Sequence, residues 1–202
     1  MRSALGRVPG HQNKIQEKKM KTFNQLRSLL FGLALIGVST SAPRAQADQD
    51  GTKPVKYRGS EVVKELVDPG TWNDDFLNAV RAERGALEDV GQDVEIEGWI
   101  NGTGRCTAVN HQIVYFTSLT TAVFYHVSVI TSANGDEIWS AGWGSVDFVT
   151  GEFEGEWIGL GGTGRFSGGS GGGTFAGAND PETGLADFEA IGGVSTVGSN
   201  KR

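Results

Sequence analysis

The stretch from Gly159 to Gly177, GLGGTGRFSGGSGGGTFAG, contains ten glycines in nineteen residues. Each glycine in a helix interior costs about 1 kcal/mol relative to alanine, so this stretch cannot be helical. Its first six residues satisfy G-x-G-x-x-G, but a dinucleotide site requires a helix directly after that motif. The glycines therefore predict sharp turns and closely approaching strands rather than a nucleotide site.

From Gln92 onward the sequence has the pattern of β-strands joined by tight turns. Turn dipeptides occur at 134–135 (NG), 150–151 (TG) and 183–184 (TG), each between runs rich in β-branched and aromatic residues. Such dipeptides are typical of two-residue hairpin loops with positive φ. Their spacing fits strands of about seven to ten residues in an antiparallel meander.

Two-residue loops would pair Tyr125 with Gly144 and Gly144 with Trp157. One face of the predicted sheet then carries aromatic rings over glycines, as expected inside a small, strongly curved, closed barrel. The residues of this face are Val123, Tyr125, Val127, Val129, Ile138, Ser140, Gly142, Gly144, Val146, Phe148, Phe153, Gly155 and Trp157. From it we take as candidate ligand-binding residues Tyr125, Ser140, Phe148, Phe153 and Trp157.

The opposite face combines large apolar residues with acids. Its residues are Phe124, His126, Ser128, Ile130, Trp139, Trp143, Asp147, Glu154, Glu156, Ile158 and Leu160. So many large apolar side chains on an outer face predict a protein contact, most simply a homo-oligomer. The expected interface residues are Phe124, Ile130, Trp139 and Trp143. Two alternatives remain: the N-terminal helix covers this face, or the two faces are exchanged and these residues form the core.

The first 47 residues have the features of an export signal. Met20 opens a basic segment, the apolar run Leu29–Val38 follows, and Ala45-Gln46-Ala47 is a small-residue cleavage site. We expect residues 20–47 to be a secretory signal peptide cleaved after Ala47, which implies a secreted or periplasmic protein. The run is too short to span a bilayer, which needs about 20 residues. Residues 1–19 are interpreted as an extension ahead of the true start at Met20, with a long signal n-region as the alternative.

Removal of residues 1–47 leaves a strongly acidic chain. That segment holds eight of the 18 Lys and Arg residues and one of the 24 acids, so 10 basic and 23 acidic residues remain, a charge of −13. Such a surface repels phosphate backbones and disfavours nucleic acid as a partner. Cys106 is the single cysteine, so no disulfide within the chain supports the fold.

Residues 48–91 precede the predicted barrel domain at 92–202. They contain a polar lead-in, a possible first strand at 55–67 and, at 71–90, the one helical pattern in the mature chain. Thr71 is the expected N-cap of this helix. The apolar stripe of the helix, expected to face the core, consists of Trp72, Phe76, Val80 and Leu87.

No catalytic or metal-binding constellation can be recognised. His111 and His126 lack metal-ligand spacing, and Cys106 is expected to be an inert small side chain. The acids near Glu154 favour a solvated face over a calcium site. We therefore expect no metal and no cofactor. Acids on the outer face also disfavour an outer-membrane barrel, so no membrane span is expected after signal cleavage.

The run NGDE at 134–137, followed by two strands and by GGTGRF at 161–166, resembles the allene oxide cyclase and dirigent barrel superfamily, especially its bacterial secreted members of unknown function. The resemblance covers roughly 98–192. It implies an all-β fold with an eight-stranded antiparallel barrel, a hydrophobic cavity and commonly a trimer. Residues 55–90, with the one N-terminal helix that we expect, are not explained by it. The chain has SGGSG at 167–171 where plant dirigent proteins have A-R-G, and the cyclase's polar catalytic set cannot be aligned to it. The resemblance thus leaves catalysis open.

Three functions follow from these observations. The first is a secreted barrel that binds a small apolar ligand in its cavity. The second is a cofactor-free isomerase or cyclase, for which Tyr125 and Ser140 are the available interior polar groups. The third is a non-catalytic surface or interaction protein that uses Trp139 and Trp143.

Overall fold

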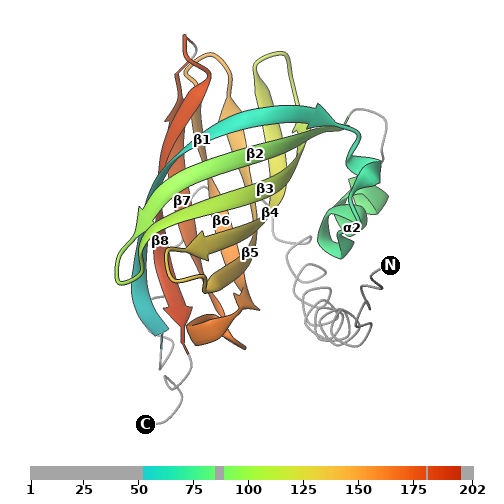
Figure 1. Cartoon of the computed structure of the whole chain (residues 1–202). Coiled ribbons are helices and arrows are strands. Elements are labelled where there is room, and N and C mark those ends of the chain that lie inside the picture. Colours follow the sequence, from blue (N-terminus) through green and yellow to red (C-terminus); the bar gives the residue numbers. More distant parts are fainter. Residues whose placement is uncertain (1–51, 85–88, 181, 197–202) are drawn as a thin grey trace, which may run out of the picture. The chain divides into compact units, whose positions relative to one another are not determined.

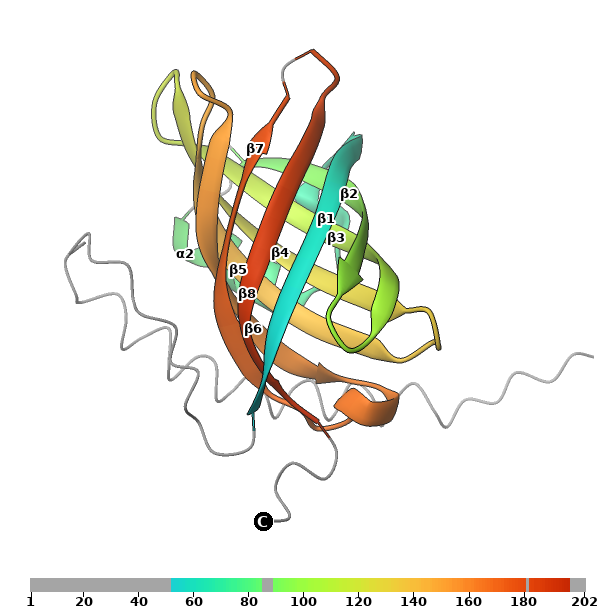
Figure 2. The same cartoon turned by 90° about the vertical axis from the view of Figure 1, so that its left-hand side faces the viewer.

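The protein folds into one closed sheet. The computed structural model describes residues 52–84, 89–180 and 182–196. Its strands are β1 (Thr52–Val67), β2 (Asp89–Ile100), β3 (Gly104–Phe116), β4 (Thr121–Ser132), β5 (Glu137–Asp147), β6 (Glu152–Gly162), β7 (Gly171–Asn179) and β8 (Leu185–Ser195). Each strand pairs antiparallel with the next, and β8 pairs with β1 to close the barrel (Figures 1 and 2). This confirms the predicted eight-stranded antiparallel barrel.

Strand β1 is part of the barrel wall. Its register with β8 runs from Thr52 opposite Ser195 to Val62 opposite Leu185, so the barrel begins well before residue 92. The signal peptide at 20–47 and the extension at 1–19 lie outside the described residues. Within the described ranges, no helix is long and apolar enough to cross a membrane.

The helical segment is shorter than the sequence pattern predicts. A 3-10 turn, η1 (Pro69–Thr71), precedes α2 (Asp75–Arg84), and Asp89 already belongs to β2. The cap is Asp74 rather than Thr71, because the Asp74 carboxylate accepts the N–H groups of Phe76 and Leu77 at 2.9 and 3.0 Å. Asp89 and Val90 pair with Tyr115 and Val114 of β3, so the helix cannot extend to Val90 as predicted. Leu87 lies outside the described residues.

Helix α2 lies on the outer face of the barrel, beside β3 and β4 (Figure 1). Its side chains Phe76, Leu77 and Val80 are buried. The Arg84 guanidinium lies 5.7 and 5.0 Å from the ring centroids of Tyr115 and Tyr125. The helix thus covers part of the outer surface, which was one of the alternatives left open by the sequence.

The turn between β4 and β5 differs from the predicted two-residue loop. Ser132 and Asp136 pair, the Gly135 N–H donates to Ser132 O at 2.8 Å, and Gly135 has a φ of 83°. The loop therefore has three residues, 133–135, with glycine in the left-handed conformation. A change of one residue in loop length moves every side chain of one strand to the other face. Phe124 consequently pairs with Gly144, where Tyr125 was expected.

The other two turns are longer than predicted by two residues. Loops 148–151 and 181–184 each contain four residues, closed by Gly151 N–H to Asp147 O and Gly184 N–H to Asp180 O, both at 2.8 Å. The expected partners are therefore displaced: Val146 rather than Phe148 pairs with Phe153. Similarly, Ala190 rather than Gly192 pairs with Phe175. A shift of the pairing by two residues keeps every side chain on the face of the sheet where it was predicted.

Of strands β4, β5 and β6, only β4 has its side chains on the opposite face of the sheet from the predicted one. Strands β5 and β6 face as predicted, with Ser140, Phe153 and Trp157 directed to the interior and Trp139 and Trp143 to the outer face. The exchanged arrangement is therefore right for β4, and the first arrangement is right for β5 and β6. Its inward residues are Phe124, His126, Ser128 and Ile130, and its outward residues are Val123, Tyr125, Val127 and Val129.

Aromatic rings rest on glycine backbones throughout the interior, as the sequence predicts. A Cβ on Gly155 would lie 2.5 Å from Cζ of Phe175, and one on Gly144 would lie 2.8 Å from Cζ of Phe124. His126 covers Gly142 in the same way. These rings need the volume that a side chain opposite them would occupy, so glycine permits a closed barrel of this diameter.

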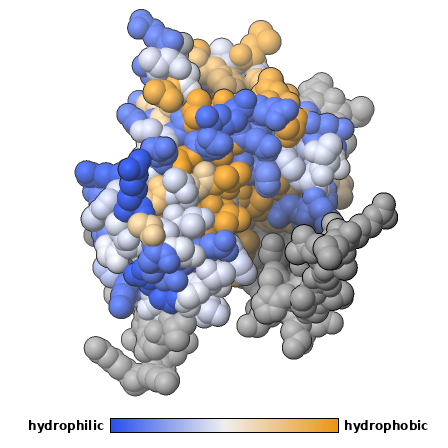
Figure 3. Space-filling model, viewed as in Figure 1, coloured by the Kyte–Doolittle hydropathy of each residue, from blue (hydrophilic) through white to orange (hydrophobic). Residues whose placement is uncertain are grey.

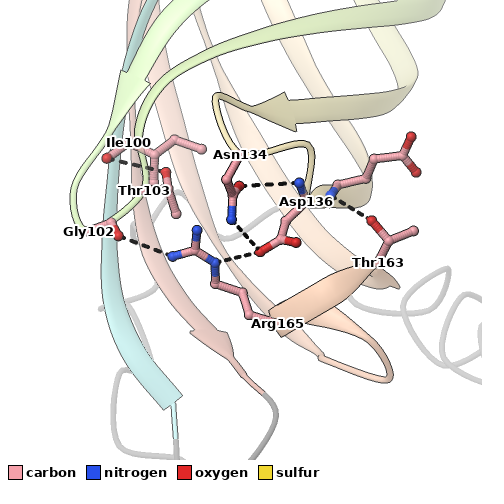
Figure 4. Close-up of polar contacts among 8 residues, drawn as sticks. Ile100, Gly102, Thr103, Asn134, Asp136, Thr163 and Arg165 are labelled. Atoms are coloured by element: carbon pink, nitrogen blue, oxygen red, sulfur yellow. Dashed lines mark hydrogen bonds and ion pairs between the residues drawn. The ribbon is translucent and has the colours of Figure 1, made fainter.

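The motif resembling the barrel superfamily closes one end of the barrel. The Arg165 guanidinium donates from Nε to Asp136 at 2.8 Å and from Nη1 to Gly102 O at 3.3 Å (Figure 4). Hydrogen bonds from Arg165 and then Asn134 hold the pKa of Asp136 below its ordinary value. Gly164 has a φ of 53°, and a Cβ there would collide with the Asp136 carboxylate. The motif therefore ties three turns together.

Substitution of Gly155 by alanine should destabilise the protein strongly. The new Cβ would lie 2.2 Å from Trp143 O and 2.5 Å from the Phe175 ring, so backbone and ring must both move. We expect a loss of about 2 kcal/mol in the free energy of unfolding, measured by denaturant titration. Gly159→Ala on the same strand is the control, because its Cβ comes no closer than 3.1 Å to another atom. Equal losses in both variants would contradict this account.

Candidate functional site

The barrel encloses a cavity of about 80 Å³. Most of its wall is apolar and includes four aromatic rings from β6, β7 and β8. The apolar residues that line it are Val55, Ile96, Ile100, Phe124, Ile130, Ile138, Phe153, Trp157, Phe175, Phe188, Ala190 and Val194. Enclosure by an apolar wall with a few polar groups is the usual character of a small-molecule site.

One side of the cavity is polar. Asn110, Ser128 and Ser140 are directly paired across β3, β4 and β5, point inward and are buried. The next inward pair along the same strands is Gln112 and His126. We call these five residues the polar wall. Hydrogen-bonding groups are thus concentrated on adjacent strands, facing aromatic and aliphatic groups across the cavity.

Several buried polar atoms around the cavity have no hydrogen-bond partner among the described residues. They include Oδ1 of Asn110 and Nε1 of Trp157. The Tyr57 hydroxyl lies beside the weakly hydrogen-bonding Cys106 thiol, and burial, followed by that neighbour, raises the pKa of Tyr57. Buried polar groups are almost always paired, and an unpaired one costs roughly 1–3 kcal/mol. An occupant of the cavity would supply the missing partners.

Glu61 is a half-buried acid that lines this otherwise uncharged cavity. It lies on β1 between Ile96 of β2 and Ala186 of β8, and within the described ranges no residue gives its carboxyl a hydrogen bond or ion pair. Burial raises its pKa to about 7. Near neutral pH the carboxyl therefore exists in both protonation states, as suits a group that exchanges protons.

His126 is held in its neutral form. The imidazole lies 5.7 Å from the Phe175 ring centroid and 6.1 Å from that of Phe124, and burial lowers its pKa to about 4. Its folded pKa is below the unfolded value, so the stability it contributes is lost as pH falls from 6.5 towards 4. Near neutral pH the ring can accept or donate a hydrogen bond without carrying charge.

The structure brings together some of the predicted ligand-binding residues and separates others. Ser140, Phe153 and Trp157 line the cavity. Tyr125 does not, because it faces outward under Arg84, and Phe148 lies in the β5–β6 loop, stacked on Phe116 at 5.6 Å. The placement of Tyr125 and Phe148 was therefore wrong. The causes are the three-residue β4–β5 turn and the four-residue β5–β6 turn.

The expected interface residues also divide into two groups. Phe124 and Ile130 line the interior and cannot form an outer contact, which corrects their predicted placement. Trp139 and Trp143 lie on the outer face, where Trp139 Nε1 donates to Glu137 at 2.9 Å.

Most of the polar interior does not follow from the sequence pattern. The predicted register puts His126 and Ser128 on the outer face, and it does not reach Tyr57, Glu61 or Asn110. A signal was present in β4, where FYHVSVI allows either facing and the polar residues His126 and Ser128 share a face with Phe124. For β1, the pairing with β8 across the whole chain determines the facing, and no local pattern reveals it.

The polar groups of this site are suited to hydrogen bonding and proton exchange. No group of three or more His, Cys, Asp and Glu in the described ranges is arranged to hold a metal ion. The arrangement offers a carboxyl that titrates near neutrality, a neutral imidazole and amide and hydroxyl groups on one wall. It can orient a small molecule by hydrogen bonds and exchange a proton with it.

Comparisons with known proteins add a likeness in fold. No family model matches the chain, and no curated protein matches it. The structure is similar to that of a pterocarpan synthase dirigent protein, with 14% sequence identity, a TM-score of 0.44 and coverage of 75% of this chain and 97% of that one. The strand order and register described above, rather than this similarity, establish the closed eight-stranded barrel.

Burial of Glu61 predicts a characteristic dependence of stability on pH. The folded carboxyl keeps its proton to about pH 7, whereas its ordinary pKa is 4.5, so stability falls as pH rises through that window. We expect the free energy of unfolding of Glu61→Gln to exceed that of the native protein by about 2 kcal/mol at about pH 8 and by little at about pH 4.

Thermal and denaturant unfolding at the two pH values would measure this difference. Glu97→Gln is the matched control, because Glu97 faces outward on the adjacent strand with its side chain 73% exposed. A gain for Glu61→Gln that is the same at both pH values would show that the carboxyl does not titrate in this window.

Proposed function

We propose that the protein binds a small, largely apolar molecule inside the barrel and that this molecule carries hydrogen-bonding groups. The observation that carries the proposal is the pair of unpaired buried atoms, Asn110 Oδ1 and Trp157 Nε1, on residues lining one apolar cavity. A purely structural core would place apolar groups here at lower cost.

The two atoms indicate which groups the ligand should carry. Trp157 Nε1 is a donor and requires an acceptor such as a carbonyl or ether oxygen, whereas Asn110 Oδ1 requires a hydroxyl or N–H donor. The rings of Phe153, Phe175 and Phe188 favour a flat apolar body between these groups. A volume of about 80 Å³ is small beside typical ligand sites of about 300–1,000 Å³. A cavity of about 150 Å³ holds one benzene ring, so a ligand of one substituted ring enters only if side chains around this cavity move.

A comparison of a phenol with its hydrocarbon analogue tests this proposal. We expect 4-methylphenol to bind about tenfold more tightly than toluene, because only the phenol satisfies the buried acceptor. Asn110→Leu should remove this preference while retaining toluene binding. Isothermal titration calorimetry or ligand-detected NMR would measure both affinities.

Thr107→Val is the control variant, since Thr107 is exposed on the same strand and should not alter binding. Failure of both compounds to bind, or equal affinity for both in the native protein, would contradict the proposed site. Circular dichroism would show whether Asn110→Leu retains the native fold.

A cofactor-free isomerase or cyclase is the second candidate function. The observation that favours it is Glu61, whose carboxyl titrates near neutrality while His126 stays neutral in the same cavity. Glu61 would move a proton on a bound substrate, and the polar wall would hold the substrate in a reactive conformation. In that case the native protein should convert a bound substrate into an isomer of equal mass. Glu61→Gln should still bind the substrate, but the NMR spectrum of the substrate should stay unchanged over time.

Export and self-association also remain proposals. The signal sequence and cleavage site support export of residues 48–202, and outward-facing Trp143 and Val129 support a homo-oligomer, a trimer by resemblance, or a non-catalytic contact surface. Native mass spectrometry of the exported protein would give its N-terminus and its subunit number.

A further inference from the structure

A second surface feature lies away from the cavity, at the end of the barrel where β3 joins β4 and β5 joins β6. Four large hydrophobic side chains are exposed there: Phe116 by 51%, Leu119 by 100%, Phe148 by 48% and Val149 by 74%. We call these residues the apolar tip. Figure 3 shows hydrophobic residues in this region, at the top of the view.

The apolar tip is fixed in position by hydrogen bonds. The Phe148 N–H donates to Thr120 O at 2.8 Å and joins the two hairpins. The Ser118 hydroxyl accepts the N–H groups of Thr120 and Thr121, both at 3.1 Å. The Asp147 carboxylate accepts the Val149 N–H at 2.7 Å. The backbones of both loops are therefore already ordered, so that binding orders only the apolar side chains.

The two ends of the barrel differ in chemistry. At the opposite end, the turns 101–104 and 133–136 present asparagine, glycine, threonine and aspartate and are linked by Arg165. Exposed hydrophobic side chains concentrated on hairpin loops at one end indicate an interaction surface rather than scattered surface residues.

A second copy of the chain does not fit this surface. The four exposed side chains offer on the order of 400 Å², so a tip-to-tip pair would bury about 800 Å², below the 1,200 Å² or more of stable interfaces. The hairpins also project from the barrel, which makes the surface convex (Figure 1). A lipid surface, in contrast, adapts to a projecting apolar group and surrounds it on all sides.

We propose that the apolar tip inserts into the interfacial region of an uncharged lipid surface. The hydroxyls of Thr117, Ser118, Thr120 and Thr150 flank the four side chains at the level where headgroups would lie. The nearby charges on the hairpins are acidic: Asp147, Glu152, Asp180 and Glu182. These carboxylates would repel anionic headgroups, so the surface selects zwitterionic lipid. This proposal does not depend on the ligand of the cavity.

A fluorophore placed at the tip distinguishes this contact from any made by the apolar run at 29–38. Leu119→Cys would be labelled with an environment-sensitive dye, because the native Cys106 is buried and does not compete. With phosphatidylcholine vesicles we expect a blue shift at Leu119→Cys and none at Asn134→Cys, a control label in the turn at the other end. Phosphatidylglycerol in the vesicles should weaken binding at low salt, and added salt should restore it.

Unlabelled variants provide a second measurement. Leu119→Ser should reduce partitioning of the full chain to phosphatidylcholine vesicles by about tenfold, whereas Asn134→Ser should leave it unchanged. No shift at the tip label, or equal shifts at both labels, would overturn the proposal. Tip-dependent self-association without vesicles, detected by light scattering, would overturn it in favour of a protein partner.

Discussion

Aromatic rings seated on glycine backbones are the constraint on which this structure depends. Each of these rings occupies the space that a side chain at the glycine would need. Phe175 over Gly155 and Phe124 over Gly144 show how the sheet accommodates its rings. The same two rings line the cavity. The close approach of the strands and the apolar character of the site therefore depend on the same residues.

Much of this fold could be predicted from sequence because its main determinants are local. Glycine content, alternation and turn residues indicate an antiparallel barrel with rings over glycines. The facing of β4 could not be predicted, because NG occupies the last two positions of a three-residue loop as readily as both positions of a two-residue loop. An error of one residue in the length of the loop that ends at Gly135 was enough to predict Tyr125 inside and Phe124 outside.

The candidate site was less predictable than the fold. Its polar groups come from β1, β3, β4 and β5, and the inward facing of each depends on a different turn or long-range pairing. Glu61 acquires its unusual pKa only when β8 closes over β1, an event between residues more than 120 positions apart. Glu61 in the segment SEVVKELV, which also contains Glu65, gives no local sign of burial. The chemical properties of the site therefore depend on closure of the barrel.

Closure of the barrel restricts the insertion and deletion of residues in this chain. An insertion of one residue in any hairpin would turn a strand inside out relative to its neighbour, and in a closed ring no free edge can absorb the mismatch. The register shifts at Val63/Glu65 in β1 and opposite Trp139/Ser140 in β6 are places where an odd residue has been accommodated within a strand. Loop lengths in such a barrel should therefore vary between relatives in steps of two, and each odd step should appear together with a new bulge.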